Sequence, residues 1–481
     1  MSRILWWVVL AIGVAAVLAF SVLQRQAHEG GARMDSLVIR GATLIDGTGR
    51  APLEHATVII HGDKIARIDT NAQASWPAGV QVIDARGKFL IPGLWDTHIH
   101  IGGSAGGSVT VEEFSEEQFA LNWRAYLYNG VTSIVDLGGV KDGMLQWRKM
   151  ERDGELLAPR IFTVGPIFTA PGGHPAGTIY KDLDWLIEQA TRQVSDPAQA
   201  REEVRKLIAD GVDAIKAVYD DVGGRVPKLA REVLQAIIEE AHRHGKRVFV
   251  HVGTSQDALD ALNAGADGLE HMISAHESGL DEALQLAARH GAFWTPTLAV
   301  YEAFAHAGDP EYITNYETTG SVSHVIRESL QHPQSRWSSL PEAARDGWRH
   351  RYAGVMTAMQ KAHALGIKIA LGTDAGNPAV FHGLSVHREL ELLVRAGYSP
   401  MEAIIAATKT AAEKLGVAKE LGTIEPGKGA DLVLLSANPL EDIRNTRTIE
   451  LVIKRGAVYK ARGACDQAWG AARPARSSHR S

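Results

Sequence analysis

Cysteine is almost absent from the sequence, since Cys465 is the single one among 481 residues. One thiol cannot form an intramolecular disulfide, so the fold must rest on its apolar core in any redox compartment. A zinc site built from cysteine ligands is excluded for the same reason. An excess of basic residues is also missing, because 50 Lys and Arg residues face 56 Asp and Glu residues, a net charge of −6. That balance argues against nucleic acid as a partner.

The residues that are abundant indicate a globular chain with room for a histidine-based site. Hydrophobic residues make up 45% and charged residues 22%, which is typical of a globular protein and not of a disordered or collagen-like chain. The twenty histidines leave open a metal site made of histidine and aspartate ligands.

An uncharged apolar run lies near the N-terminus. Residues 4–23 stand between Arg3 and Arg25, and twenty helical residues at about 1.5 Å each span about 30 Å, the hydrocarbon core of a membrane. A cleaved signal peptide is the alternative, with Val17-Leu18-Ala19 as its cleavage site. We favour an uncleaved anchor, because the apolar run continues beyond that site. Residues 1–26 are therefore predicted as anchor or signal segment, with a membrane contact through residues 4–23 if uncleaved, and 27–35 as a polar linker. Both alternatives predict an exported catalytic part.

Beyond the linker, the sequence predicts a β domain that is split by a long α/β segment. Residues 36–92 and 421–462 consist of short apolar runs broken by turn residues, and Gly62-Asp63 fits a hairpin turn. One small β-sandwich can use both ends of the chain. Residues 93–420 instead alternate short β-branched runs with amphipathic or Ala-rich helical stretches. The Ala-, Arg- and Ser-rich tail 463–481 is predicted to be disordered.

Eight strand-like runs occur within 93–420, at 94–100, 131–137, 161–168, 214–219, 247–252, 268–272, 293–300 and 367–373. Strand–helix alternation implies parallel strands, and eight of them imply an α/β fold of the (β/α)8 TIM-barrel type. One helix is well marked, because Ser399, Pro400 and Glu402 provide an N-cap, a first-turn proline and a capping box, and Gly416 ends it. The long segment 301–360 is either a helical lid over the barrel mouth or a surface excursion.

Two histidines end the first strand-like run, in Asp96-Thr97-His98-Ile99-His100. Side chains at i and i+2 share one face of a strand, so both imidazoles point the same way, as two ligands of one metal require. An HxH pattern by itself is weak evidence, because two surface histidines produce it more often. Its position directly after the Ile91-Pro92-Gly93 break that opens the barrel strengthens the metal-site hypothesis.

Four more metal-type side chains stand in or after later runs: Lys216, His251, His271 and Asp374. Each has an ordinary explanation on its own, since a lysine can snorkel outward, a histidine can be a satisfied core residue and an aspartate can cap a turn. Active sites of such barrels form at the C-terminal ends of the strands. Together with the two histidines above, six metal-type side chains on that rim favour a metal centre.

These motifs resemble the amidohydrolase superfamily, in its branch of prolidase-like and imidazolonepropionase-like hydrolases. The resemblance covers about residues 36–460 and rests on Pro92-Gly93-Leu94-Trp95-Asp96-Thr97-His98-Ile99-His100, Ile215-Lys216, Val250-His251, Glu270-His271, Gly372-Thr373-Asp374-Ala375-Gly376, His382-Gly383, Arg388-Glu389-Leu390 and the run 422–432. The Gly-rich segment 425–432 resembles the family's return into the β-sandwich. It lacks the strand–loop–helix context of a phosphate loop.

The resemblance implies a centre of two divalent metals. One metal would be bound by His98, His100 and Asp374, a second by His251 and His271, and a CO2-derived carbamate on Lys216 would bridge both. Zinc suits imidazole and carboxylate ligands, and the apolar flanks of the lysine favour the neutral amine that a carbamate needs. A hydroxide between the metals would attack the carbonyl carbon. Asp374 would take the proton and pass it to the leaving nitrogen.

Three further residues are candidates for contact with the substrate. His174 lies in a loop, 171–175, that resembles a family loop reaching the site, and it would hydrogen-bond the substrate or the oxyanion unless it faces solvent. Tyr219 would polarise the carbonyl or hold a carboxylate, with plain packing as the alternative. Arg388 would pair with a substrate carboxylate, or else lie on a helix surface.

The leading hypothesis is a dipeptidase-like or prolidase-like hydrolase that cleaves amide bonds in small dipeptide-like or N-acyl amino-acid molecules. A mononuclear cyclic-amide hydrolase of the imidazolonepropionase type, or a deaminase, is second, although such sites usually dispense with the bridging lysine. A non-enzymatic binding protein is third, and the complete ligand set argues against it. Because many relatives are homo-oligomers, the resemblance extends that expectation to this chain.

Overall fold

The computed structural model describes residues 36–70, 75–76, 79–103, 105–106, 116–314 and 324–460. The predicted anchor or signal segment and the predicted tail lie outside these described residues. Within them, none of the helices combines the length and the apolar character needed to cross a membrane.

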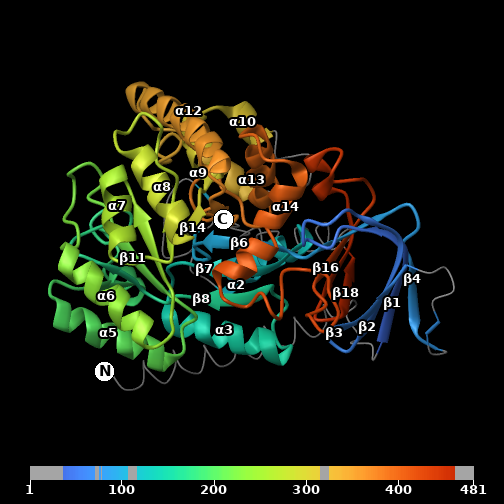
Figure 1. Ribbon diagram of the computed structural model, residues 1–481. Helices are drawn as coiled ribbons and strands as arrows, with labels where there is room; N and C mark the ends of the chain where they lie inside the picture. The colour runs from blue at the N-terminus through green and yellow to red at the C-terminus, as the bar shows by residue number, and fades with distance from the viewer. Residues whose placement is uncertain are drawn as a thin grey trace, which may run out of the picture.

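One sheet joins the two ends of the described chain (Figure 1, right). Its strand order is β18-β17-β16-β5-β1-β2-β3, and β4 pairs with β1. The two ends meet where β5 runs antiparallel to β16. Gly62 adopts a φ of +59° in the two-residue turn between β2 and β3, as expected for the predicted hairpin. The strands are β1 (Ser36–Leu44), β2 (Leu53–His61), β3 (Lys64–Asp69), β4 (Gln81–Asp84), β5 (Phe89–Pro92), β16 (Leu432–Leu435), β17 (Ile449–Lys454) and β18 (Ala457–Lys460).

The middle of the chain forms a barrel of parallel strands (Figure 1, left). Each predicted run contains a strand, and the third is divided at residues 164–166. The barrel closes where the Asp374 amide donates to the His98 carbonyl at 2.7 Å and the His100 amide donates to the Ala375 carbonyl at 2.8 Å. The strands are β6 (Leu94–Ile99), β7 (Val131–Asp136), β8 (Arg160–Thr163), β9 (Ile167–Thr169), β11 (Ile215–Tyr219), β12 (Val248–Val252), β13 (Gly268–Glu270), β14 (Phe293–Thr295) and β15 (Lys368–Ile369), with the short β10 (Thr191–Gln193) beside β9.

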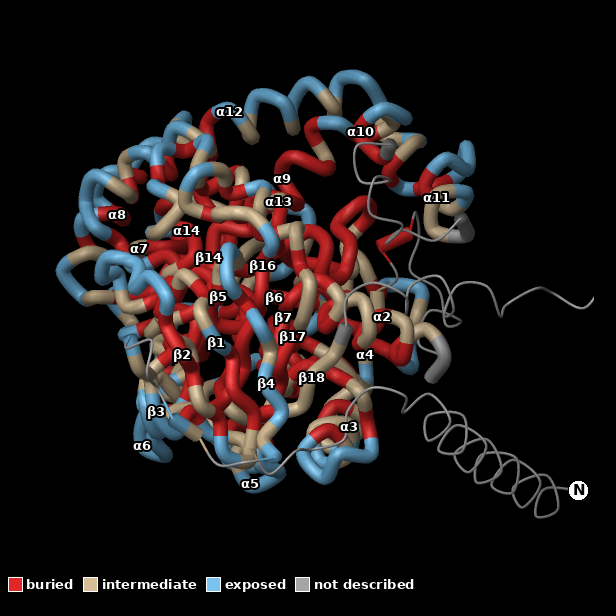
Figure 2. The backbone as a smooth tube through the Cα atoms, turned by 90° about the vertical axis from the view of Figure 1, so that its right-hand side faces the viewer, coloured by how far each residue is buried: buried red, intermediate tan, exposed pale blue. Residues whose placement is uncertain are grey.

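Helices surround the barrel, with buried faces inward and exposed faces outward (Figure 2). In α6 (Arg231–Arg243), Val233, Ile237 and Ala241 are buried at the helical spacing that places them on one face. The other barrel helices are α2 (Glu116–Tyr128), α3 (Lys141–Asp153), α4 (Asp184–Ala190), α5 (Pro197–Asp210), α7 (Ser255–Asn263), α8 (Leu280–His290), α13 (Leu384–Arg395), α14 (Pro400–Ala406) and α15 (Lys409–Lys414). A 3-10 helix, η3 (Ile443–Arg447), precedes β17.

Two predicted elements differ from the structure for identifiable reasons. The seventh run ends as a strand at Thr295, and helix α9 (Leu298–Ala305) begins within it, because the buried Glu389 carboxylate accepts the first amides of that helix, from Leu298 and Ala299, at 2.8 and 2.7 Å. The helix that starts at Ser399 has the predicted capping box, but it is divided into α14 and α15. The carbonyls of residues 406 and 407 accept amides from the barrel at 3.0 and 2.8 Å, so they are not free to continue the helix.

The described parts of the segment 301–360, residues 301–314 and 324–360, pack onto the barrel mainly as helices. After α9 come α10 (Pro310–Thr314), α11 (His324–Gln331) and the long α12 (Glu342–Ala364), which packs against α9 and α8 (Figure 1). Trp337 is buried, and its indole donates to the Ala303 carbonyl at 2.8 Å. This segment is therefore a packed helical cover whose inner residues belong to the barrel core.

Candidate active site

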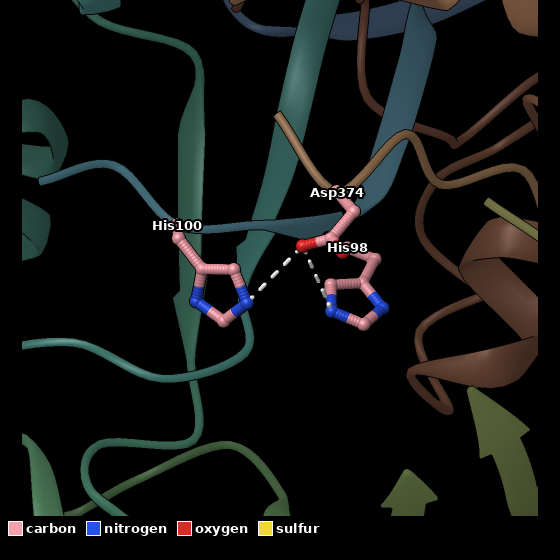
Figure 3. Close-up of side chains that lie close together, drawn as sticks. All are labelled: His98, His100 and Asp374. Carbon is pink, nitrogen blue, oxygen red and sulfur yellow. Dashed lines mark ion pairs between the residues drawn. The ribbon is translucent and has the colours of Figure 1, made fainter. Parts of the chain in front are cut away.

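Three of the predicted ligands meet at the barrel closure (Figure 3). Asp374 Oδ1 lies 3.5 Å from His98 Nε2 and 3.3 Å from His100 Nε2. The three donor atoms lie within 4.8 Å of one another, close enough to hold one metal ion. Strand β6 supplies His98 and the residue directly after the strand is His100, and their i, i+2 spacing places both side chains on one face.

The backbone around Asp374 is built to aim this carboxylate. Asp374 has a φ of +61°, a conformation that non-glycine residues seldom adopt. The turn is held by the buried Asp96, which accepts from the Thr373 amide at 2.9 Å and the Thr373 hydroxyl at 2.6 Å. His271, like Asp374, has a positive φ, of +69°. Strained backbone therefore occurs at two of the six predicted ligands.

In each of the four predicted histidine ligands, a residue outside the ligand set contacts one ring nitrogen, and the other ring nitrogen has no such outer partner. Nδ1 of His98 contacts the Glu270 carboxylate at 2.8 Å, and Nδ1 of His100 contacts the Gly138 carbonyl at 3.1 Å. Nε2 of His251 contacts Asp220 at 3.1 Å, and Nδ1 of His271 contacts the Thr297 hydroxyl at 2.8 Å. Such outer partners fix the ring and its tautomer, and they leave the opposite nitrogen for a metal.

The rings form a continuous line across the barrel mouth. Successive ring centroids are 5.4 Å apart for His100 and His98, 4.9 Å for His98 and His271, 4.3 Å for His271 and His251, and 5.1 Å for His251 and His174. Burial, followed by neighbouring positive groups, lowers the pKa of His98 to about 4 and that of His271 well below its usual value. Neutral imidazoles are the form in which histidine binds metals.

Lys216 lies in the interior without a partner. Its side chain is buried in β11, and among the described residues no hydrogen-bond partner reaches its Nζ or Asp374 Oδ1. Burial lowers the pKa of Lys216 to about 8, against the pull of Glu270. Buried polar atoms without partners are rare in folded proteins. The donor set and these orphaned atoms therefore fit bound divalent cations and a modified lysine.

A buried ion pair beneath the histidines was not predicted from the sequence. Lys414, on α15, donates to Glu270 Oε1 and to the Thr295 hydroxyl, each at 2.6 Å, and both Lys414 and Glu270 are fully buried. The other Glu270 oxygen holds His98. Burial works against ionisation here, but Lys414 and then Lys216 lower the pKa of Glu270 to about 2. The sequence gives little signal for this pair, because α15 reads KTAAEK and the contact of Lys414 with Glu270 spans 144 residues.

The three residues predicted to contact the substrate differ in their position relative to the histidine site. His174 lies beside His251 and bonds the Thr178 hydroxyl at 2.7 Å, and burial lowers its pKa to about 3. Tyr219 stands three residues after Lys216, hence on the opposite face of β11. Its hydroxyl donates to Asp260 at 3.2 Å, which makes the predicted catalytic contact wrong in this structure.

Arg388 is also directed away from a substrate role. Its guanidinium binds the buried Glu302 at 2.7 and 2.8 Å and Glu391 at 2.6 Å. The prediction of a substrate carboxylate on Arg388 is therefore corrected to a packed ion-pair network.

Known proteins share this fold and about a quarter of the aligned residues. The chain is 28% identical over 461 residues to the ochratoxinase of Aspergillus niger, covering 89% of this chain and 87% of that protein. The crystal structure of a Xaa-Pro dipeptidase with methionine bound in its active site matches with a TM-score of 0.69 and 26% identity, over 88% of this chain and 100% of that one. The A. niger ochratoxinase structure shows the same fold, with a TM-score of 0.70, 24% identity and coverage of 89% and 96%.

A family model also matches most of the chain. The sequence profile of the Amidohydrolase family aligns with residues 89–459, which take in the whole barrel and the returning strands. The chain belongs to the amidohydrolase family of hydrolases that act on carbon–nitrogen bonds.

Proposed function

We propose that this enzyme cleaves amide bonds of small dipeptide-like or N-acyl amino-acid substrates at a centre of two divalent cations. The observation that carries the proposal is the buried, unpartnered Lys216 amine among four imidazoles that each have one nitrogen held by an outer partner. His98, His100 and Asp374 would hold one cation, His251 and His271 the other, and a carbamate on Lys216 would bridge them. Zinc suits this donor set.

Two such cations supply a hydroxide near neutral pH and polarise the carbonyl oxygen. Side chains of this chain would carry out the proton transfers and orient the substrate. Although burial opposes it, His98 and His100 hold the pKa of Asp374 below its usual range, so the carboxylate is ionised. Asp374 then accepts a proton on a carboxylate oxygen and returns it to the leaving nitrogen. His174, whose Nδ1 contacts the Thr178 hydroxyl, would hydrogen-bond the carbonyl oxygen through Nε2.

The names of the similar proteins support the substrate class. A Xaa-Pro dipeptidase acts on dipeptides, and its active site holds a free amino acid, methionine. A barrel of the same fold suits molecules of that size. A mononuclear cyclic-amide hydrolase or a deaminase is the rival, and the buried Lys216 disfavours it.

Metal content per chain tests the proposal directly. We expect about two divalent cations per chain after purification without chelators, and a 13C carbamate NMR signal after incubation with 13C-labelled bicarbonate. Lys216→Ala should lose that signal, about one cation and amide hydrolysis, whereas Lys206→Ala, an exposed lysine on α5, should keep all three. One cation with an unmodified Lys216 would support the mononuclear rival. A Lys216→Ala protein with two cations and full activity would refute the proposal.

A further inference from the structure

Arg351 lies at the mouth of the barrel, beside two neighbouring aromatic rings. Its guanidinium carbon is 5.5 Å from the Tyr301 ring centroid and 5.7 Å from the Trp348 ring centroid. One Nη nitrogen donates to the Gly253 carbonyl at 3.5 Å. The side chain is half-buried, on the long helix α12.

These contacts place Arg351 next to two predicted metal ligands. Gly253 is two residues beyond His251, and a Cβ on it would come within 2.4 Å of the Asp220 carboxylate that holds His251. The Tyr301 hydroxyl donates at 2.8 Å to the carbonyl of Met272, the residue after His271. Arg351 is therefore anchored at the C-terminal ends of β12 and β13, where a barrel binds its substrate.

Among the residues that the structure describes, no carboxylate forms an ion pair with Arg351. Nearby arginines are neutralised: Arg388 by Glu302 and Glu391, and Arg349, on the same helix, by Glu342 and Asp346. The half-buried guanidinium of Arg351 therefore keeps a positive charge that an anionic ligand can pair with. The Tyr301 and Trp348 rings, whose centroids are 6.1 Å apart, lie together on one side of the guanidinium. Guanidinium N–H groups match a carboxylate in a bidentate pair.

We propose that Arg351 binds the carboxylate of the substrate and so selects amides that carry a free carboxylate close to the scissile bond. This inference rests on the proposed function for its amide, and Arg351 takes the role that the sequence suggested for Arg388. Arg351 determines specificity and takes no part in the proton transfers.

The first experiment compares two substrates in metal-loaded enzyme: N-acetyl-L-methionine and N-acetyl-L-methioninol, which lacks the carboxylate. In Arg351→Gln, we expect KM for the acid to rise about 10- to 100-fold, the range for a lost hydrogen-bonded charge, with kcat nearly unchanged. The alcohol should be turned over as by the wild type. Arg351→Lys should restore part of the preference, and Arg349→Gln, the matched control, should equal the wild type. An equal loss on both substrates would mean that Arg351 only supports the fold.

The second experiment separates this inference from the proposed function. Calorimetry on the metal-loaded protein measures binding of L-methionine and L-methioninol, neither of which contains an amide. We expect the wild type to prefer the acid and Arg351→Gln to lose that preference by about 10-fold or more, whether or not any amide is hydrolysed. If the wild type shows no preference, or Arg351→Gln and Arg351→Lys both keep it, the inference is wrong. Preference without hydrolysis would leave Arg351 in its role and refute the proposed function alone.

Discussion

Lys414 offers the sharpest test of how this barrel orients its ligands. Its ammonium is fully buried and joins Glu270 and Thr295, while Glu270 holds Nδ1 of His98. Lys414→Met removes the charge and keeps most of the volume. The change leaves the Glu270 carboxylate buried without its main counter-charge, and breaking one side of a buried pair costs about 3–5 kcal/mol.

The effect should reach the metal through His98. Partners that hold a ligating histidine are worth about 10- to 100-fold in metal affinity when removed. We therefore expect Lys414→Met to lower the urea-unfolding midpoint of the metal-free protein and to weaken zinc binding by about 10- to 100-fold in a chelator competition titration. Lys409→Met, on the same helix and without a buried ion pair, should change neither quantity.

A double variant separates charge from packing. Replacing Glu270 by Gln in the Lys414→Met background removes the uncompensated carboxylate, and neutral replacements of buried pairs are often close to neutral in stability. The urea midpoint should return toward the wild-type value. If Lys414→Met unfolds at the wild-type urea concentration and binds zinc as tightly, the ion pair does not support the site and the reasoning fails.

Three further changes test other contacts. Asp220→Ala should weaken zinc binding by about 10- to 100-fold, because Nε2 of His251 loses its partner, and a chelator titration that shows no change would contradict this role. Tyr219→Phe should cost about 0.5–1.5 kcal/mol in urea unfolding through the lost bond to Asp260 and leave kcat/KM within about twofold; a large loss of kcat would reinstate Tyr219 as catalytic. Burial opposes ionisation of Asp431, but Arg160 lowers the pKa of this carboxyl group in the folded protein. The ionised carboxylate therefore stabilises the fold above the unfolded-state pKa of about 3.9, and this stabilisation is lost as the pH falls below that value. Asp431→Asn should therefore be less stable at pH 7 and lose less stability in acid, as measured by urea midpoints from pH 7 to pH 3.

The parts of the fold that sequence patterns predicted are those that depend on near neighbours in the chain. Each β-branched run contains a strand, and the capping box at Ser399 is present. His98 and His100 share a strand face, so their meeting with Asp374 followed once the barrel closed. The prediction that Tyr219 faces the site could have been corrected from the sequence. Tyr219 is three residues after Lys216, and an odd spacing places its side chain on the other face of the strand.

The parts that could not be predicted depend on contacts between distant segments. Glu389 starts helix α9 from about 90 residues away in sequence, and barrel amides that bond the carbonyls of residues 406 and 407 divide the helix after Ser399. Arg388 follows the same rule, because Glu302 reaches it from another helix. In each case the partner of a buried charge or carbonyl lies far away in the sequence, so no local pattern predicts the contact.

The arrangement of charges explains why Lys216 has no partner. Glu270 is the carboxylate within electrostatic reach of both buried lysines, and Lys414 holds it at 2.6 Å. A lysine paired with that carboxylate would stay protonated, and only a neutral amine can take up CO2. Lys414→Met should therefore free Glu270 for Lys216 and diminish the 13C carbamate signal, and the added Glu270→Gln change should bring the signal back. A carbamate signal that is unchanged in Lys414→Met would show that Lys216 is kept neutral by burial alone.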